Sequence, residues 1–556
     1  MFELFGSAAI AAAWLIPDHY LPWLSAYNDS AMALGLMLLL LGTFRRGATP
    51  ARVPAAFWVV VAVAAIPWIQ WTAGQLAFTG DAVVGSVYVL GLAIAVLTGF
   101  TWARRDAKGS AALLAGTIVL GSVLSAAIAL FQGLRVGNLG LLSLGLCTGG
   151  RACANLAQPN NLATLLGLGA MGLLLLHEQR RLGAWVAGLL LGFLLLGAAT
   201  SQSRTAMLFG PAVLVGLFIA RQRGVALRVS LLAVCAATLA HWLMSWGWPV
   251  LQDALLLDTT ASLSARSMDA GRFQGWAMFV DALSQSPWKG VGWLQTASAQ
   301  LAVADRYPPL HGVWQQAHNL FLELALWCGY PLGVFLSGLI LFWYASRWWR
   351  VASVEGVVGL LSVTLFGIHS MLELPYHYAY FLIPVGLWIG HVEHACGTPG
   401  TRKLAALRWV PVALAFVMVA GMWRDYPQVE EDARRVRFEN LRIGPMAAAG
   451  SAPDAPFLSS QTSFLMFIRT KPTPGMTAAE LASMEAVVKR FPYSGVMAKM
   501  SWAWALNGRL PDAISMFKKI RYVHGDAMYR KIRKDLHDRV VVEQEGLRGL
   551  DQALPE

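Results

Sequence analysis

The stretch GYPLGVFLSGLILFWYASRWWR (329–350) contains no charged residue before Arg347 and ends with two arginines on either side of two tryptophans. An uncharged apolar run of about this length is sufficient to cross the hydrocarbon core of a bilayer as a helix. Tryptophan and arginine at its end are typical of the interface between lipid and cytoplasm. The stretch therefore predicts a membrane-spanning helix with a cytoplasmic end.

Comparable apolar runs recur along the chain up to about residue 423, and a more polar segment follows. With 56% hydrophobic and 13% charged residues among 556, the chain is too apolar for a soluble enzyme. We expect an all-α, polytopic helical membrane protein with about 12–13 transmembrane helices. The runs lie near residues 4–16, 29–43, 53–69, 83–101, 111–131, 161–176, 183–199, 205–220, 229–246, 329–346, 352–372, 379–393 and 407–423.

The net charge of +12 arises largely from basic residues in short loops, which is an orientation signal and does not indicate a nucleic-acid partner. Counted from a cytoplasmic N-terminus, HEQRR (177–181), RQRGVALR (221–228) and RWWR (347–350) all fall on the cytoplasmic side. The opposite side then receives the long insert near 247–317 and the C-terminal segment.

These features predict that the chain is divided into four parts. Residues 1–246 form N-terminal transmembrane helices, and 247–317 form a large non-cytoplasmic loop with amphipathic helices. Residues 318–423 form C-terminal transmembrane helices, and 424–556 form a helical domain on the same side as the loop. Within that domain, residues 491–520 predict two helices joined by an Asn-Gly turn at 507–508. This hairpin resembles a tetratricopeptide unit, although an ordinary small helical domain fits equally well.

Two cysteines, Cys147 and Cys153, share one predicted non-cytoplasmic loop, LCTGGRAC (146–153). Their spacing allows a small disulfide loop, and an oxidising compartment would permit the bond.

Two arginines on the non-cytoplasmic side are candidates for phosphate binding. Arg204, in SQSRTA (201–206), follows the hydrogen-bonding side chain of Gln202, and a guanidinium matches phosphate oxygens in bidentate fashion. Arg272 lies at the start of a predicted amphipathic helix whose stripe we expect to lie against the membrane (Phe273, Trp276, Phe279 and Leu283). The alternatives are snorkelling to lipid headgroups for Arg204 and loop solvation for Arg272. The Pro/Gly turn SPWKGVGW (286–293) is expected to be structural.

His318 begins an apolar helical run and is the natural candidate for proton transfer near neutral pH. Glu323 lies about one helical turn further on and is a candidate to orient it. The alternative is a packed, hydrogen-bonded histidine with no catalytic role.

Further polar residues at non-cytoplasmic helix ends are candidates for binding a substrate, such as a sugar or a molecule that accepts it. Tyr376 and Tyr380 are in ELPYHYAY (373–380), and His19 is in PDHYLPW (17–23). Gln158 and Asn161 head the sixth apolar run, where helix capping explains them at least as well. Aromatic-belt placement is the alternative for the tyrosines.

The chain has no Walker-type phosphate loop, no Asp-x-Asp pair and no His/Cys/Glu spacing typical of zinc. We therefore expect neither nucleotide-sugar donor chemistry nor a metal or other cofactor.

The order of these motifs resembles that of the bacterial protein O-oligosaccharyltransferases, which glycosylate pilins and other periplasmic proteins, within the superfamily of O-antigen ligases and polymerases. The resemblance covers most of the chain. It rests on PDHYLPWLS (17–25), NLAQPNNLATLL (155–166), SQSRTA (201–206), GRFQGW (271–276), SPWKGVGW (286–293), HNLFLELALWCGYPLG (318–333), ELPYHYAYFLIPVGLWIG (373–390) and PYSGVMAKMSWAWALNGR (492–509).

The resemblance implies an inner-membrane enzyme whose active site and C-terminal domain are periplasmic. It implies transfer of a preassembled glycan from undecaprenyl pyrophosphate to a Ser or Thr of a pilin-like acceptor, without a metal and with inversion. Arg204 and Arg272 would bind the pyrophosphate, and His318 would orient or deprotonate the acceptor hydroxyl. Apolar grooves between the membrane spans would hold the polyprenyl chain, and membrane lipids would surround the spans.

Two rival functions stay open at this point. An O-antigen ligase or polymerase would use the same donor and site with another acceptor. A lipid-linked glycan transporter would move the donor without breaking a bond, and would be expected to carry charged groups in mid-span.

Overall fold

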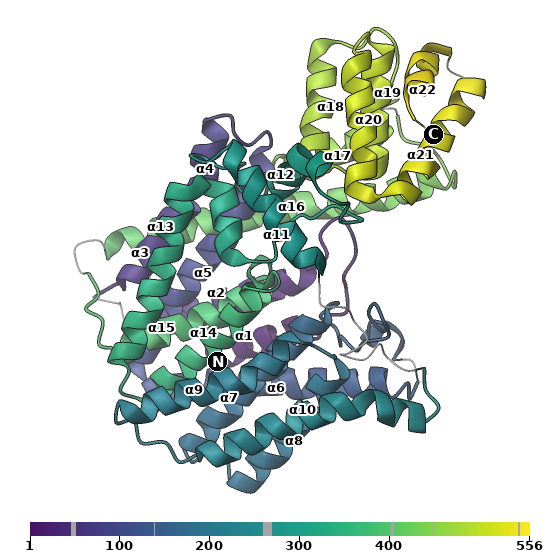
Figure 1. Cartoon of the computed structure of the whole chain (residues 1–556). Coiled ribbons are helices and arrows are strands. Elements are labelled where there is room, and N and C mark those ends of the chain that lie inside the picture. Colours follow the sequence, from purple (N-terminus) through teal and green to yellow (C-terminus); the bar gives the residue numbers. More distant parts are fainter. Residues whose placement is uncertain are drawn as a thin grey trace. The chain divides into compact units, whose positions relative to one another are not determined.

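The computed structural model describes residues 1–45, 52–137, 139–258, 270–401, 405–448, 450–542 and 545–555. Within these ranges the chain is mostly helical and has no β-strand beyond two isolated bridges (Figure 1). The predicted all-α fold class is confirmed. Residues 259–269 of the predicted 247–317 loop lie outside the described residues.

Each predicted apolar run overlaps helical structure, although the run 4–16 extends beyond α1 and the run 53–69 is divided between α3 and α4. By length and hydropathy, eight helical segments of the described chain are suited to cross a membrane, and α1, α8 and α14 are apolar but shorter. The protein is therefore a multi-pass membrane protein, and the total of about 12–13 spans stays a prediction. The helices are α1 (Phe2–Ala13), α2 (Ala26–Arg45), α3 (Ala55–Ala64), α4 (Ile66–Thr72), α5 (Thr79–Arg105), α6 (Ala107–Gly133), α7 (Pro159–Glu178), α8 (Ala184–Thr200), α9 (Phe209–Gln222), α10 (Leu231–Ala254), α13 (Leu320–Arg350), α14 (Val354–Ser370), α15 (Ala379–Ala395) and α16 (Trp409–Asn440).

The chain forms two compact units, each made of three separate stretches. Unit 1 contains Met1–Val63, Tyr88–Met268 and Leu339–Ala415. Unit 2 contains Ala64–Val87, Asp269–Gly338 and Phe416–Glu556. These borders differ from the domain borders expected at 247, 318 and 424, which stay predictions.

Polar side chains cap the starts of apolar helices in unit 1. Asp106, Ser230 and Ser353 each accept a hydrogen bond from the backbone N–H three residues further on, at the heads of α6, α10 and α14. The first N–H groups of a helix have no intrahelical acceptor, so such caps decide where an apolar helix begins.

The loop before α7 is closed by a disulfide between Cys147 and Cys153, whose Cα atoms lie 6.0 Å apart. The N–H of Cys147 also donates to the carbonyl of Arg151 at 2.9 Å. The small disulfide loop that the cysteine spacing allows is therefore present.

Unit 2 contains a broken helix. Gly329, inside α13, has φ 80° and ψ 168°, and Pro331 follows it. The SPWKGVGW turn fills this break with backbone hydrogen bonds. The N–H of Val291 donates to the carbonyl of Leu326, and the N–H of Tyr330 donates to the carbonyl of Pro287, each at 2.7 Å.

Glycine is required on both sides of this contact. A Cβ on Gly329 would lie 2.4 Å from the backbone of Trp288, and one on Gly290 would lie 2.2 Å from the carbonyl oxygen of Leu326. Both residues have positive φ, which glycine adopts without a steric penalty. The structural role expected for the turn is confirmed.

The amphipathic helix expected after Arg272 is present as α11 (Ala270–Gln285), but its environment differs from the prediction. Phe279 and Leu283 are buried against α12 (Thr296–Val303) and the first part of α13, whereas Phe273 is 65% exposed. The expectation that the whole stripe lies against the membrane is therefore wrong. An apolar helix face suits a protein core as well as a bilayer, so its pattern does not distinguish the two.

The C-terminal part of unit 2 is a set of amphipathic helices whose core also includes Leu301 of α12. Helices α18 (Ala478–Arg490), α19 (Ser494–Leu506), α20 (Leu510–His524) and α21 (Asp526–Val542) pack side by side, and α22 (Arg548–Ala553) follows (Figure 1). Met497, Phe517 and Tyr529 are fully buried among them. The predicted hairpin is confirmed, because Asn507 and Gly508 separate α19 from α20.

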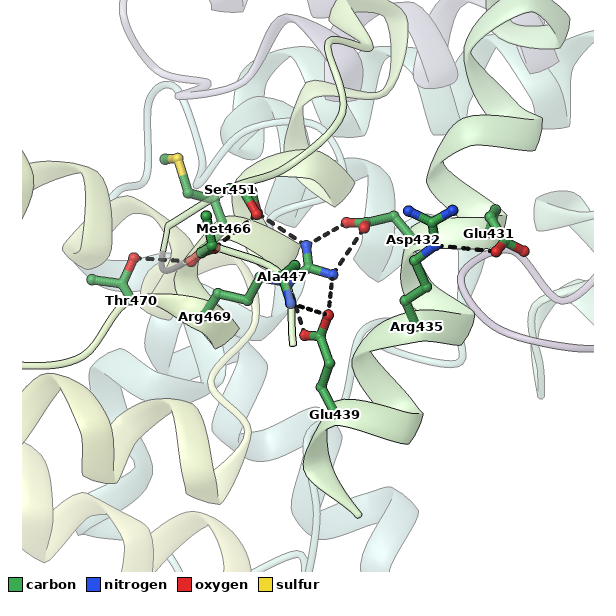
Figure 2. A network of polar contacts seen from close by, with 10 residues as sticks. Glu431, Asp432, Arg435, Glu439, Ala447, Ser451, Met466, Arg469 and Thr470 are labelled. Carbon is green, nitrogen blue, oxygen red and sulfur yellow. Dashed lines mark hydrogen bonds and ion pairs between the residues drawn. The ribbon is translucent and has the colours of Figure 1, made fainter. Parts of the chain in front are cut away.

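Figure 2 shows how the last turns of α16 hold α17 (Ser459–Arg469) within unit 2. The side chain of Arg469 is 4% exposed and pairs with Asp432 at 2.6 Å and with Glu439 at 2.9 Å. It also donates to the carbonyl of Ser451 at 3.0 Å. The two carboxylates raise the pKa of Arg469 above its ordinary value. A planar guanidinium suits two carboxylates at once.

Replacing Gly329 by alanine should disrupt the broken helix, because the new Cβ would collide with the backbone of Trp288. Gly338→Ala is the matched control in the same helix. A Cβ there meets no atom within 4 Å, and alanine favours a helix over glycine by about 1 kcal/mol. Thermal unfolding of the detergent-purified variants measures the difference. Equal melting temperatures for the two variants would contradict the packing of the turn into the break.

Candidate active site

Arg204 lies in unit 1, in the turn that joins α8 to a short 3-10 helix (Thr205–Leu208), and is half-buried. Gln202, in the same turn, is fully buried with φ 48°. Its Nε2 donates to the carbonyls of Ala199 at 2.9 Å and Ser245 at 2.8 Å, so it ties the turn to α10. The position of Arg204 at a helix end is as predicted.

A chain of hydrogen bonds next to Arg204 joins three of the motifs. The hydroxyl of Ser203 donates to Oδ1 of Asn160 at 2.6 Å, and Nδ2 of Asn160 donates to Oε1 of Glu373 at 3.2 Å. All three side chains are buried. An amide both accepts and donates, so Asn160 can link a hydroxyl to a carboxylate. Sequence reasoning did not single out Asn160, although its place beside Asn161 in QPNN was a signal.

Gln158, Asn161 and Tyr380 form a second internal cluster of unit 1. Gln158 caps α7 by accepting from the N–H of Asn161 at 2.7 Å. Nδ2 of Asn161 donates to the hydroxyl of Tyr380 at 3.0 Å, and Tyr380 is fully buried. The capping alternative is thus confirmed for Gln158, and the bonds seen for the other two are also internal.

Tyr376 and His19, also in unit 1, are half-buried. Tyr376 lies in the 3-10 turn Pro375–His377, with its ring centroid 4.9 Å from that of His377. Nε2 of His19 donates to the carbonyl of Asn155 at 2.8 Å. Burial lowers the pKa of His19.

Arg272 lies in unit 2, half-buried in the first turn of α11. Trp276 follows about one helical turn later. Its indole N–H donates to the carbonyl of Ala317 at 2.9 Å. The helix that carries Arg272 is therefore bonded to the residue that precedes His318.

His318 lies near the end of an irregular segment, residues 307–319, which we call the His318 loop. It has φ 53°, and its ring centroid lies 5.0 Å from that of Trp314 in an edge-on arrangement. Oδ1 of Asn319 accepts from the N–H groups of Phe321 and Leu322 at 3.1 Å each, so Asn319 caps α13. The prediction that His318 stands at the head of this helix is confirmed.

Glu323, expected to orient His318, is fully buried in unit 2. Its carboxylate accepts from the backbone N–H of Ala317 and from the hydroxyl of Thr296. The indole N–H of Trp327 donates to the same hydroxyl at 3.2 Å. Glu323 therefore fixes the backbone directly before His318. Sequence reasoning did not single out Thr296 and assigned Trp276 to the stripe against the membrane, because neither residue type nor local pattern marks a partner that is remote along the chain.

Arg272 and His318 thus belong to one unit, on segments that share a hydrogen bond, and Arg204 belongs to the other unit. A guanidinium at the head of a helix is suited to bind an anion, and an imidazole is suited to move a proton near neutral pH. In the described part of the chain, no three His, Cys, Asp or Glu side chains gather in a way that could hold a metal ion.

Unit 1 also contains a cavity of about 400 Å³ between α7, α8, α9 and α10. Its walls are mostly alanine, glycine and leucine side chains. They include Ala198 and Ala206 near the Arg204 turn, Ala184 at the other end of α8, and Arg228 in the turn before α10. Since α8 has 17 residues, the cavity follows a helix about 25 Å long. An elongated apolar molecule would fit this shape better than a compact polar one.

Two protein families match the chain. One, described as O-Antigen ligase, matches residues 187–337. The other, described as Virulence factor membrane-bound polymerase, C-terminal, matches residues 357–536. The middle of this helical membrane protein is thus similar to O-antigen ligases, and its C-terminal third is similar to a membrane-bound polymerase.

Two proteins of Acinetobacter baylyi (strain ATCC 33305 / BD413 / ADP1) are similar to the chain. "General O-oligosaccharyltransferase" is 28% identical over 509 residues, which cover 88% of this chain and 87% of that protein. "ComP-specific O-oligosaccharyltransferase" is 27% identical over 388 residues, 69% of each chain. These similarities confirm the resemblance to the O-oligosaccharyltransferases and support oligosaccharyl transfer as the general activity.

Replacing Glu323 by leucine should loosen the His318 loop, because the N–H of Ala317 and the hydroxyl of Thr296 would lose their acceptor. Each buried polar group left without a partner costs about 1–3 kcal/mol. Hydrogen exchange of the purified protein should show faster exchange in residues 307–319. Glu355→Leu, which removes a carboxylate bonded to Gln179 in unit 1, is the control. Unchanged exchange in the Glu323 variant would contradict the conclusion that Glu323 holds the His318 loop.

Proposed function

We propose that the protein transfers a preassembled oligosaccharide from undecaprenyl pyrophosphate to a serine or threonine of a periplasmic protein such as a pilin. The observation that carries the proposal is the similarity, over 88% of the chain, to a protein named General O-oligosaccharyltransferase. In the same proposal the protein lies in the bacterial inner membrane, with its active site and C-terminal domain in the periplasm. The positions of the basic turns support that orientation.

The proposed reaction is a single displacement. The acceptor hydroxyl oxygen bonds to the anomeric carbon while the bond from that carbon to the pyrophosphate oxygen breaks, so the configuration inverts. The electron pair of the broken bond goes to the pyrophosphate, and the hydroxyl proton goes to the imidazole of His318. Arg204 and Arg272 stabilise the charge that develops on the leaving group. For Arg204 this role rests on the sequence resemblance.

The other predicted site residues take two kinds of role in this proposal. Tyr376 and His19 are half-buried and remain candidates for contact with the sugar or the acceptor. The remaining side chains already make internal bonds, so we assign them to holding the site in shape. These are Gln158, Asn161, Gln202, Glu323 and Tyr380.

The cavity of unit 1 is our candidate for the polyprenyl chain. It begins at Ala198 and Ala206, on either side of the turn that carries Arg204, and continues between apolar helices. A chain whose diphosphate is bound at Arg204 would therefore enter it directly. The chain is already in lipid before it binds, so the cavity would recognise it by the fit of its packing contacts and not by removal of apolar surface from water.

The rival function is that of an O-antigen ligase, and the family match over residues 187–337 favours it specifically. The two functions share donor and displacement and differ only in the acceptor. Transfer to a lipid A core rather than to a protein would distinguish them.

Arg204→Ala, Arg272→Ala and His318→Ala should each abolish transfer, because each removes a group that acts on the charge or the proton in the transition state. The assay reconstitutes the purified protein in vesicles with a polyprenyl-diphosphate-linked glycan and a pilin acceptor. Product is measured by mass spectrometry of the acceptor. A parallel reaction offers lipid A core in place of pilin.

Arg306→Ala is the matched control in unit 2, since this half-exposed arginine pairs with Asp281 and not with the proposed site. It should keep wild-type activity. Product on lipid A core alone would replace the proposed function with that of a ligase. Full activity in two of the three site variants would contradict the proposed mechanism.

Gly188→Trp should fill the cavity and raise the KM for the long-chain donor about tenfold, a loss of about 1.4 kcal/mol. Gly188 lines the cavity, and a Cβ there meets no atom within 4 Å. Gly192→Trp is the control on the same helix, at a glycine with equally open surroundings that does not line the cavity. A donor with a short prenyl chain should be affected little by either change. The same KM for both variants with the long-chain donor would exclude the cavity as the chain site.

A further inference from the structure

The C-terminal helices bond directly to the His318 loop within unit 2. The N–H of Gly312 donates to the carbonyl of Val523, at the end of α20, at 3.1 Å. Nη1 of Arg490, the last residue of α18, donates to Oε1 of Gln315 at 2.9 Å. The loop therefore receives a backbone bond at Gly312 and side-chain bonds at Gln315, where Tyr493 also contributes, from the C-terminal part of the chain.

Arg490 is anchored by a buried carboxylate. Its Nε lies 3.1 Å from Oδ2 of Asp81, at the start of α5, and the two side chains are 13% and 3% exposed. Nε2 of Gln295 donates to the same carboxylate at 3.0 Å. A buried carboxylate without a cation is strongly destabilising, so Asp81 holds the guanidinium in place. The rigid fork of Arg490 then presents its remaining N–H groups to Gln315.

The bond at Gln315 lies three residues before His318. The residue directly before His318 is also held by hydrogen bonds. Ala317 is held at its N–H by Glu323 and at its carbonyl by Trp276. His318 itself has φ 53°, a left-handed conformation that a side-chain-bearing residue keeps only where its surroundings impose it. The surroundings here are these bonds, and one of them comes from the C-terminal domain.

We propose that the C-terminal domain positions His318, with Arg490 and Gln315 as the positioning residues. The inference rests on the proposed function, because it assigns a purpose to the site that contains His318. A helical domain after the last membrane helix would thus be part of the catalytic assembly. Removing its contact would leave the imidazole in the protein but misplaced relative to the acceptor hydroxyl.

Gln315→Met is the cleanest test, since it removes the acceptor for Arg490 and leaves the pair of Arg490 with Asp81 intact. Arg490→Lys keeps the charge for Asp81 but lacks the second arm of the fork. Each change should lower kcat about ten- to a hundredfold, the cost of a misplacement of about 1 Å, and leave the donor KM within about twofold. The kcat of the double variant should be no lower than that of the worse single variant, because both changes break the same contact between Arg490 and Gln315.

Arg469→Met is the matched control. It breaks a comparably buried set of ion pairs in the same domain, to Asp432 and Glu439, but none to the His318 loop. It should lower the melting temperature of the full chain and leave kcat per folded enzyme unchanged. Gln315→Met should lower kcat per folded enzyme and leave the melting temperature unchanged.

Wild-type kcat in both Gln315→Met and Arg490→Lys would overturn the inference. An equal loss of kcat in Arg469→Met would also overturn it, because the domain would then act only through general stability. These outcomes are separate from failure of the proposed function. If His318→Ala retains transfer, the proposed mechanism fails; if that variant is inactive while Gln315→Met is fully active, only the positioning role fails.

Discussion

The break of α13 at Gly329 is the constraint on which much of unit 2 depends. A helix that stops inside an apolar segment leaves backbone N–H and C=O groups that lipid cannot satisfy. The turn 286–293 supplies the missing partners at Leu326 and Tyr330, and it must therefore stay packed against α13. That requirement fixes the segment from α11 to α13 as one assembly. Arg272 lies at its beginning, and His318 lies just before its last helix.

Buried polar contacts complete this assembly where backbone pairing ends. Glu323 of α13 accepts from Ala317, and Trp276 of α11 donates to Ala317, so two helices bond to one residue of an otherwise irregular loop; Thr296 of α12 bonds to Glu323. A loop with so many bonds is held in one conformation, although it contains no regular secondary structure. The backbone of His318 is thus fixed more by side chains distant in the sequence than by its neighbours.

Local patterns were enough to predict the fold class, the helical runs, the Asn507-Gly508 hairpin and a feasible disulfide between Cys147 and Cys153. Each of these depends on residues that are close together in the chain. The contacts of the candidate site do not. Asn160 meets Glu373 across 213 positions, and Arg490 meets Asp81 across 409. Hydrophobic periodicity could also not tell that Phe279 faces protein, because the same stripe would suit a membrane surface. The roles of Arg204, Arg272 and His318 stay predictions, since they concern a donor and an acceptor.

The demands of the proposed reaction offer a reason for combining apolar helices with a polar helical domain. The donor is an amphiphile, so its long chain needs an apolar cavity, whereas its diphosphate needs cations that stay ionised near water. The acceptor is a protein, and its hydroxyl must meet the anomeric carbon in line, which a mobile base could not ensure. A loop between membrane helices is a poor support for such a base when its only anchors are its two ends. Bonds from a folded domain to Gly312 and Gln315 provide additional anchors. The apolar part of the chain would then determine where the donor binds, and the polar part would determine how accurately the hydroxyl is placed to attack the anomeric carbon.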